Sequence, residues 1–158
     1  MAAPAATART TPSGLMLEDG FKTLITFARS PSVKLWEITV KPVGYDGGDK
    51  IKLSNMHNTA LHTFAPRKLK MLTDGSFKCH YDPGALLTIL TTLLNYKDTI
   101  TETYADGTTF CYFGVLNKFE RDEHQEGEAP TATVSFFATN RDSSGVEQTP
   151  VLTEVTGT

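Results

Sequence analysis

The chain has 158 residues, of which 39% are hydrophobic and 21% are charged, and its formal net charge is −3. This balance predicts one soluble domain, spanning residues 1–158, that is large enough to bury a hydrophobic core. No hydrophobic run approaches membrane-spanning length and the N-terminus lacks a signal-peptide core, so we expect no membrane partner and no secretion by that route.

Charge is unevenly distributed along the chain. Residues 1–78 carry 11 basic and 6 acidic side chains, a net +5, whereas residues 79–158 carry 4 and 12, a net −8. This asymmetry favours head-to-tail self-association, in which unlike parts of neighbouring copies meet.

The N-terminal third predicts a flexible start followed by short strands. Residues 1–14 are mainly Ala, Thr and Pro and are expected to form a flexible N-terminal arm. Residues 15–17 and 21–28 read as strands around an Asp-Gly turn. Residues 35–41 alternate in hydrophobicity, which predicts a strand with Trp36 as its core anchor.

Residues 42–58 are the longest irregular segment of the sequence. A loop of this length in a compact domain is usually functional or disordered. Its apolar side chains would be out of place on a loop that stays in water, so we expect the segment to be mobile in the monomer and to pack on a partner. The predicted interface residues are Val43, Tyr45, Asp46, Asp49, Lys50, Ile51, Lys52, Leu53 and Met56.

The middle of the chain predicts one helix, preceded by a strand over 59–65 and a hairpin over 68–73 and 76–81. Asp82 is a suitable N-cap, Pro83 suits the first helical position, and Asn95 suits a left-handed C-terminal position. Helical spacing predicts a wide apolar face made by Ala85, Leu86, Leu87, Ile89, Leu90, Leu93 and Leu94.

The second half predicts long antiparallel strands. Residues 99–104 and 108–119 form a hairpin around Asp106-Gly107, and an acidic loop follows over 120–128. On the strand that begins after Pro130, the residues Ala132, Val134, Phe136 and Ala138 alternate with Thr131, Thr133, Ser135 and Thr139. Residues 140–158 are expected to form a polar C-terminal arm with a short apolar pattern over 151–155.

These elements predict a mainly β fold, an antiparallel β-sandwich or barrel-like domain with one flanking α-helix. Phosphate-binding loops, zinc and calcium motifs and a GxSxG elbow are missing from the sequence, so we expect no catalytic residue, no cofactor and no metal. Cys79 and Cys111 lie in predicted strands and indicate buried thiols rather than a disulfide framework. The pattern favours self-assembly over catalysis, and a ligand-binding β-barrel or small enzyme with an apolar pocket is the alternative.

A set of short motifs resembles the major tail (tail tube) proteins of long-tailed bacteriophages. The motifs are DGF at 19–21, ITF at 25–27, WEITVKP at 36–42, GYDGGD at 44–49, MHNT at 56–59, APRKL at 65–69, YDP at 81–83, DGT at 106–108 and EGEAPTATV at 126–134. Each motif is weakly specific by itself, and the resemblance rests on their order and spacing over residues 15–141.

The resemblance implies a structural virion protein whose hexameric rings stack into the tail tube, the conduit for DNA. It also implies partners in the tape measure, tail terminator and distal tail proteins, and assembly in the host cytoplasm. The family resembles the tube proteins of contractile tails and of type VI secretion, which share the fold and differ in biology. A conduit for DNA should present small polar or acidic groups, and Thr131, Thr133, Ser135 and Thr139 are the candidate lumen face.

Overall fold

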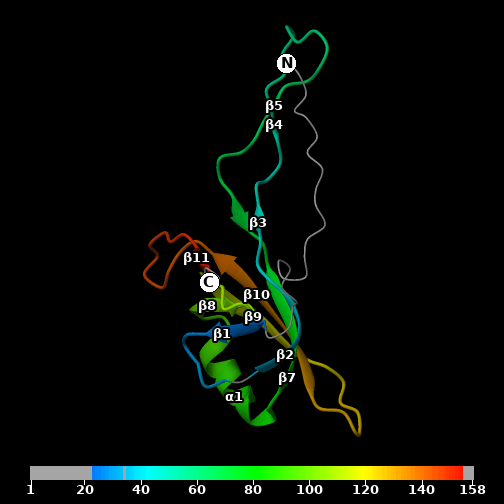
Figure 1. Ribbon diagram of the computed structural model, residues 1–158, viewed down its shortest axis with the longest axis vertical. Coiled ribbons are helices and arrows are strands. Elements are labelled where there is room, and N and C mark those ends of the chain that lie inside the picture. Colours follow the sequence, from blue (N-terminus) through cyan, green and yellow to red (C-terminus); the bar gives the residue numbers. More distant parts are fainter. Residues whose placement is uncertain (1–22, 34, 155–158) are drawn as a thin grey trace.

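The protein is described here by a computed structural model that covers residues 23–33 and 35–154 (Figure 1). Its main sheet contains, in spatial order, β1 (Leu24–Phe27), β8 (Lys97–Thr103), β9 (Thr109–Arg121), β10 (Thr131–Thr139), β7 (Gly75–Tyr81) and β2 (Leu35–Lys41), and the short β11 (Val151–Thr153) adds to β9. All these pairs are antiparallel. The predicted mainly β, antiparallel fold with one helical segment is therefore confirmed. The predicted N-terminal arm, residues 1–14, and the predicted strand 15–17 lie outside the described residues.

The sheet curls so strongly that its two edge strands approach each other. The carboxyl group of Glu37, on β2, accepts a hydrogen bond of 2.9 Å from the backbone N–H of Ile25, on β1. A side chain thus bridges the two edges where a backbone ladder would close a complete barrel.

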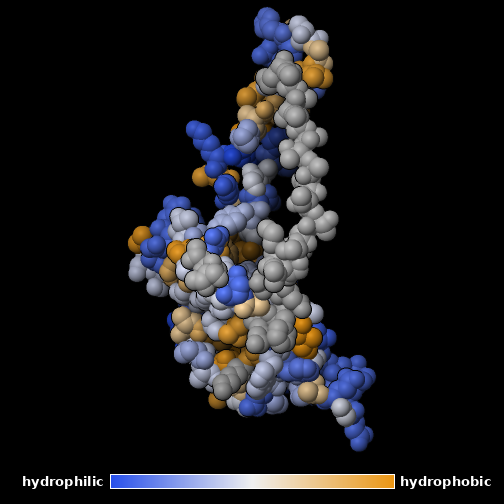
Figure 2. Space-filling model, viewed as in Figure 1, coloured by the Kyte–Doolittle hydropathy of each residue, from blue (hydrophilic) through white to orange (hydrophobic). Residues whose placement is uncertain are grey.

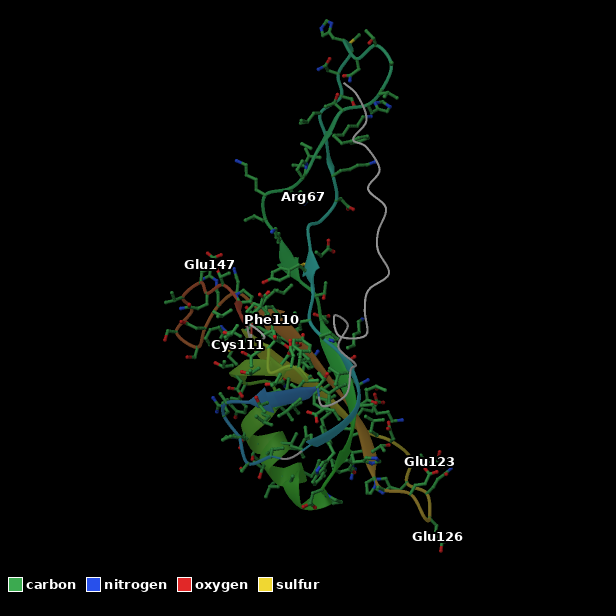
Figure 3. The ribbon with its side chains drawn as sticks, viewed as in Figure 1. Arg67, Phe110, Cys111, Glu123, Glu126 and Glu147 are labelled. Atoms are coloured by element: carbon green, nitrogen blue, oxygen red, sulfur yellow. The ribbon has the colours of Figure 1, made fainter. Side chains whose placement is uncertain are left out.

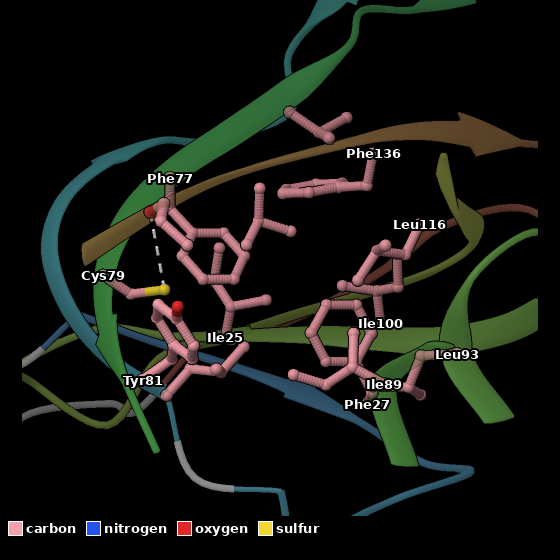
Figure 4. Packing of buried hydrophobic residues seen from close by; sticks show 14 of the residues in the cluster. Ile25, Phe27, Phe77, Cys79, Tyr81, Ile89, Leu93, Ile100, Leu116 and Phe136 are labelled. Atoms are coloured by element: carbon pink, nitrogen blue, oxygen red, sulfur yellow. Dashed lines mark hydrogen bonds between the residues drawn. The ribbon is translucent and has the colours of Figure 1, made fainter. Parts of the chain in front are cut away.

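The core lies inside this curled sheet and is filled by side chains from every long strand (Figure 4). On β10, Ala132, Val134 and Phe136 are buried, as the alternation predicts. Phe136 packs near Phe77 and Tyr112, with ring centroids 6.1 and 6.4 Å apart respectively. Both cysteines lie in strands as predicted, Cys79 fully buried in β7 and Cys111 half-buried in β9.

The single helical segment runs from Pro83 to Leu93 and changes geometry along its length. It begins as a 3-10 turn (Pro83–Ala85), continues as one α turn, α1 (Leu86–Thr88), and ends as a π turn (Ile89–Leu93). The predicted ends are confirmed, because Asp82 accepts from Gly84 N at 2.9 Å and Asn95 has a φ of 63°.

The predicted apolar helix face is confirmed in part, because Ala85 and Leu94 pack against the core beside Ile89 and Leu93. Ile89 and Leu93 are buried, whereas Leu87 is 72% and Leu90 47% exposed. The helical segment touches the sheet from one side only, so the covered stripe is narrower than the predicted face. Leu87 and Leu90 lie outside that stripe.

The prediction that Trp36 is a core anchor is also wrong, because its side chain is 54% exposed. Leu35 and Glu37 pair with Tyr81 and Cys79 of β7, and the register then shifts between Glu37 and Thr39. This bulge leaves Ile38 as the extra residue and turns Val40 inward, opposite Phe77. The bulge breaks the simple alternation, so Trp36 and Val40 lie on opposite faces.

Residues 42–74 form one long projection from the sheet, which we call the protrusion (Figure 1). Two short ladders hold it together, β3 (Tyr45–Asp46) with β6 (Met71–Leu72) and β4 (Ile51–Lys52) with β5 (Phe64–Ala65). The predicted loop 42–58 is thus only the outgoing half of this element. The predicted strand 59–65 is confined to its last two residues. Of the predicted hairpin, the strand over 76–81 is confirmed as β7, but the strand over 68–73 shrinks to β6, which pairs with β3 rather than with β7.

The remaining connections agree better with the sequence. The Asp-Gly turn joins β8 to β9, with Gly107 at a φ of 88° that favours glycine. The acidic loop, residues 120–128, joins β9 to β10, and β9 continues into its first two residues. Residues 140–154 fold back onto the sheet, where β11 pairs with residues 109–111 of β9.

Candidate assembly surface

Beyond its root, over residues 45–71, the protrusion is made of side chains that have no core to pack against. Every residue from Tyr45 to Met71 is exposed except Ser54 and Ala65, which are half-buried. Hydrophobic and hydrophilic side chains alternate along its surface (Figure 2). The large exposed hydrophobic residues of the protrusion are Tyr45, Ile51, Leu53, Met56, Leu61, Phe64, Leu69 and Met71.

Most of the predicted interface residues lie together on this element. Tyr45 and Asp46 form β3, Ile51 and Lys52 form β4, and Asp49, Lys50, Leu53 and Met56 lie between or beyond these strands. Val43 is the exception, because it is only 7% exposed and belongs to the hydrophobic core. The expectation that its side chain is available to a partner is therefore wrong.

The return half of the protrusion carries candidate residues that sequence reasoning missed. Leu61, Leu69 and Met71 are 83%, 86% and 63% exposed. Arg67 on this half donates to the backbone oxygen of Asp49 at 2.9 Å, and the ammonium of Lys50 lies 3.9 Å from the centroid of the Phe64 ring. The sequence of the return half contains exposed apolar residues as frequently as residues 42–58 do, and this could have identified it. The prediction of a buried strand over 59–65 concealed this similarity.

The protrusion is basic, and the acidic loop lies at the opposite end of the molecule (Figure 3). Between residues 42 and 74 there are five Lys or Arg and three Asp side chains. In the acidic loop, Asp122 pairs with Lys78 at 3.4 Å and Glu120 with Lys118 at 2.6 Å. Within the described residues no ion pair engages Glu123, Glu126 or Glu128, so the tip of the loop remains net negative.

Asp122, at the base of the acidic loop, is held in its charged form by two contacts. Its Oδ2 accepts a hydrogen bond of 2.7 Å from the Thr131 hydroxyl, which lowers the pKa of the Asp122 carboxyl, and Lys78 lowers it further. This contact ties the base of the acidic loop to β10.

The candidate lumen residues Thr131, Thr133, Ser135 and Thr139 share the outer face of β10, away from the core. The structure extends this face across the sheet, because Thr99, Thr101 and Thr103 of β8 also point outward, and Thr101 and Thr103 lie opposite Cys111 and Thr109 of β9. Hydroxyl side chains thus line part of one sheet surface, which also presents Phe113 of β9 and Phe137 of β10. Only the β10 members were recognisable from sequence, since the others required the register.

The described residues contain no group of three or more metal-binding side chains. They also contain no helix long and apolar enough to cross a membrane. One surface hollow lies where the root of the protrusion meets the end of β10, lined by Lys70, Met71, Leu72, Ala138, Thr139 and Asn140. A second runs between β2 and β7 beside Val40 and Lys78. Both are on the surface, and neither opens onto a buried polar cluster.

The fold is shared with a chain of a prophage baseplate and a chain of a contractile injection system. A chain of the anti-feeding prophage (AFP) baseplate superposes with a TM-score of 0.56 at 7% identity, covering 92% of this chain and 97% of that one. A chain of the sheath–tube complex of an extracellular contractile injection system (PVC), in its extended state, superposes with a TM-score of 0.59 at 13% identity, covering 92% and 100%. No family model matches the chain, and no curated protein matches it in sequence.

Proposed function

We propose that this protein is a non-enzymatic structural component of a phage-type tail, and that it forms hexameric rings that stack into the tail tube. The observation that carries the proposal is the protrusion, a long element covered with exposed apolar and basic side chains on a small sheet domain. Such a surface is costly in an isolated monomer and is typical of a segment that another molecule covers. The similarity in fold, over 92% of this chain, to a chain of a prophage baseplate and a chain of a sheath–tube complex supports a tail role.

Stacking is proposed to be head to tail, with the protrusion of one copy meeting the acidic loop of a copy in the next ring. The two elements lie at opposite ends of the molecule and carry opposite charge, so each new ring presents the same pair of surfaces (Figure 3). A contact that does not close on itself generates a filament. Opposite charges raise the rate of encounter and set polarity, whereas exposed ion pairs contribute only about 0–1 kcal/mol each. The apolar residues of the protrusion therefore supply most of the stability.

The hydroxyl-rich outer face of the sheet is the proposed wall of the lumen. Small polar side chains without a dense positive charge would let DNA pass without holding its phosphates. In this proposal the protein is located in the virion after assembly in the host cytoplasm, and its partners are further copies of itself and the other tail proteins.

A tube of a contractile injection or secretion system is the second candidate. It is favoured by the second fold comparison, because that chain belongs to the sheath–tube complex of a contractile injection system. The same rings and stacking would serve both functions, and only the cargo would differ. The alternative of a ligand-binding barrel has less support, because aromatic and aliphatic side chains fill the space inside the sheet.

Negative-stain electron microscopy of the concentrated full-length protein tests the proposal. We expect rings with six-fold symmetry and stacks of such rings. A variant with Met56, Leu61 and Leu69 all replaced by Ser removes apolar surface from the protrusion without touching the core, and should give single rings or monomers. A wild-type protein that remains monomeric at every concentration would contradict the proposal.

A further inference from the structure

Among the residues that the structure describes, Glu102 is the one acidic residue that is 0% exposed. It lies directly beneath the root of the protrusion. It sits on β8, with its side chain pointing into the core. Its Oε1 accepts hydrogen bonds from the Val43 backbone N–H at 3.1 Å and from the Tyr112 hydroxyl at 2.8 Å, and its Oε2 accepts from the Tyr104 hydroxyl at 2.9 Å. The buried acid therefore has three donors.

The bond to Val43 is the only one of the three that reaches outside β8, β9 and the turn between them. Val43 is the second residue of the protrusion, and the residue before it, Pro42, has no N–H to offer. The side chain of Val43 is itself in the core, so both its backbone and its side chain are held.

The return strand of the protrusion is held at the same level. Gly44 and Thr73 bond to each other twice, from Gly44 N to Thr73 Oγ1 and from Thr73 N to Gly44 O, both at 2.9 Å. Gly75 then packs under Phe136, where an added Cβ would lie 2.4 Å from the ring. Beyond this level the protrusion has only two short ladders and no core. Its direction is therefore decided at its root.

We infer that Glu102 is a positioning residue, which fixes the angle at which the protrusion leaves the sheet. A hydrophobic residue would fill the same space, but it would leave the Val43 N–H buried without a partner. Burial and the nearby Glu102 raise the pKa of Tyr104 to about 12 and also raise that of Tyr112, so both hydroxyls remain donors throughout the physiological range. This inference rests on the proposed function and deepens it, because the proposed stacking of rings depends on the protrusion.

Amide hydrogen exchange in the unassembled full-length chain tests the inference without requiring any assembly. In the wild-type protein, the Val43 amide should exchange at a rate close to that of core amides of β9. The Glu102→Met variant, which keeps the length of the side chain and removes both acceptors, should accelerate exchange at Val43 by at least about tenfold relative to the β9 amides. That factor corresponds to about 1.4 kcal/mol of lost hydrogen bonding.

Asp98 supplies a matched control. It lies on the same face of β8, is 7% exposed, and accepts backbone hydrogen bonds from Arg29 and Thr99 rather than from the protrusion. Asp98→Asn should destabilise the protein without changing exchange at Val43 relative to β9. Equal relative acceleration in both variants would overturn the inference.

A distance measurement gives a second readout. Spin labels at Lys52→Cys, on the protrusion, and Lys97→Cys, on β8, should show one narrow distance distribution in a background of Cys79→Ala and Cys111→Ser. Adding Glu102→Met should broaden that distribution, and an unchanged width would overturn the inference. If Glu102→Met does not fold, the wild-type exchange rate decides, because a Val43 amide that exchanges as fast as amides at the protrusion tip would also overturn it. Wild-type protein that never forms rings would contradict the proposed function and leave these tests intact.

Discussion

The sheet domain and the protrusion differ in how their side chains are buried and in how their strands are held. In the sheet, inward residues such as Ile100, Tyr112 and Phe136 are at most 2% exposed, and each strand is held by ladders of several residues. In the protrusion, two-residue ladders hold side chains that are almost all exposed. The sheet can therefore be stable alone, whereas the protrusion exposes apolar surface that only a partner can bury. Changes in the two regions should separate folding from assembly.

Shortening the protrusion should give the largest effect on assembly and a small effect on stability. Asp46 and Met71 lie opposite each other in the β3–β6 ladder, so residues 47–70 can be replaced by Asn-Gly, which favours a two-residue hairpin turn. We expect a folded protein with nearly unchanged thermal unfolding that forms no stacked rings in electron micrographs. Tubes of normal length from this variant would show that stacking uses another surface.

Core truncation should give the largest effect on stability. Leu93→Ala removes a side chain that is 1% exposed and should lower the free energy of unfolding by about 2–5 kcal/mol. Leu90→Ala, three residues earlier and 47% exposed, should cost less than about half as much. Urea unfolding of both variants measures the difference. Equal losses would indicate that the helical segment packs by a wider face.

Charge reversal should change the rate of stacking more than its extent. Lys50→Glu with Lys52→Glu should slow elongation, and adding Glu123→Lys with Glu126→Lys should partly restore it, because each pair lies at an opposite end of the molecule. Added salt should slow the wild type as the screening length falls to about 8 Å near physiological ionic strength, while finished tubes persist. Time-resolved light scattering measures elongation. Rates indifferent to both salt and reversal would mean that stacking is selected by shape alone.

Alkaline pH should weaken the sheet by a smaller amount. Burial raises the pKa of the Cys79 thiol to about 12, and the nearby Glu37 acts in the same direction. Because the folded state holds this proton more tightly than the unfolded state, its contribution is complete below about pH 9 and is lost as pH rises toward 12. Urea unfolding at pH 8 and pH 10.5 should show the loss, and Cys79→Ala should reduce it. If the free energy of unfolding falls equally between these pH values in Cys79→Ala, the loss comes from other groups, among them Tyr104.

Local chemistry determined several features of this protein from sequence alone. Asp82, Pro83 and Asn95 mark the ends of the helical segment because capping depends on neighbouring backbone groups. Asp106-Gly107 places the β8–β9 turn because a left-handed residue is required there. The alternation over residues 131–139 identifies the buried face of β10, because a regular strand has a period of two.

Only the tertiary structure decided which segments pair across a distance. Tyr45 pairs with Leu72, and nothing near either residue specifies a partner so far along the chain. The bulge at Ile38 depends on the register of β7, so the exposure of Trp36 follows from a neighbouring strand. Val43 and Glu102 are 59 residues apart and meet only because the sheet curls over the root of the protrusion. A period reveals which face of an element is buried, whereas pairing, register and buried polar contacts arise from the chain as a whole.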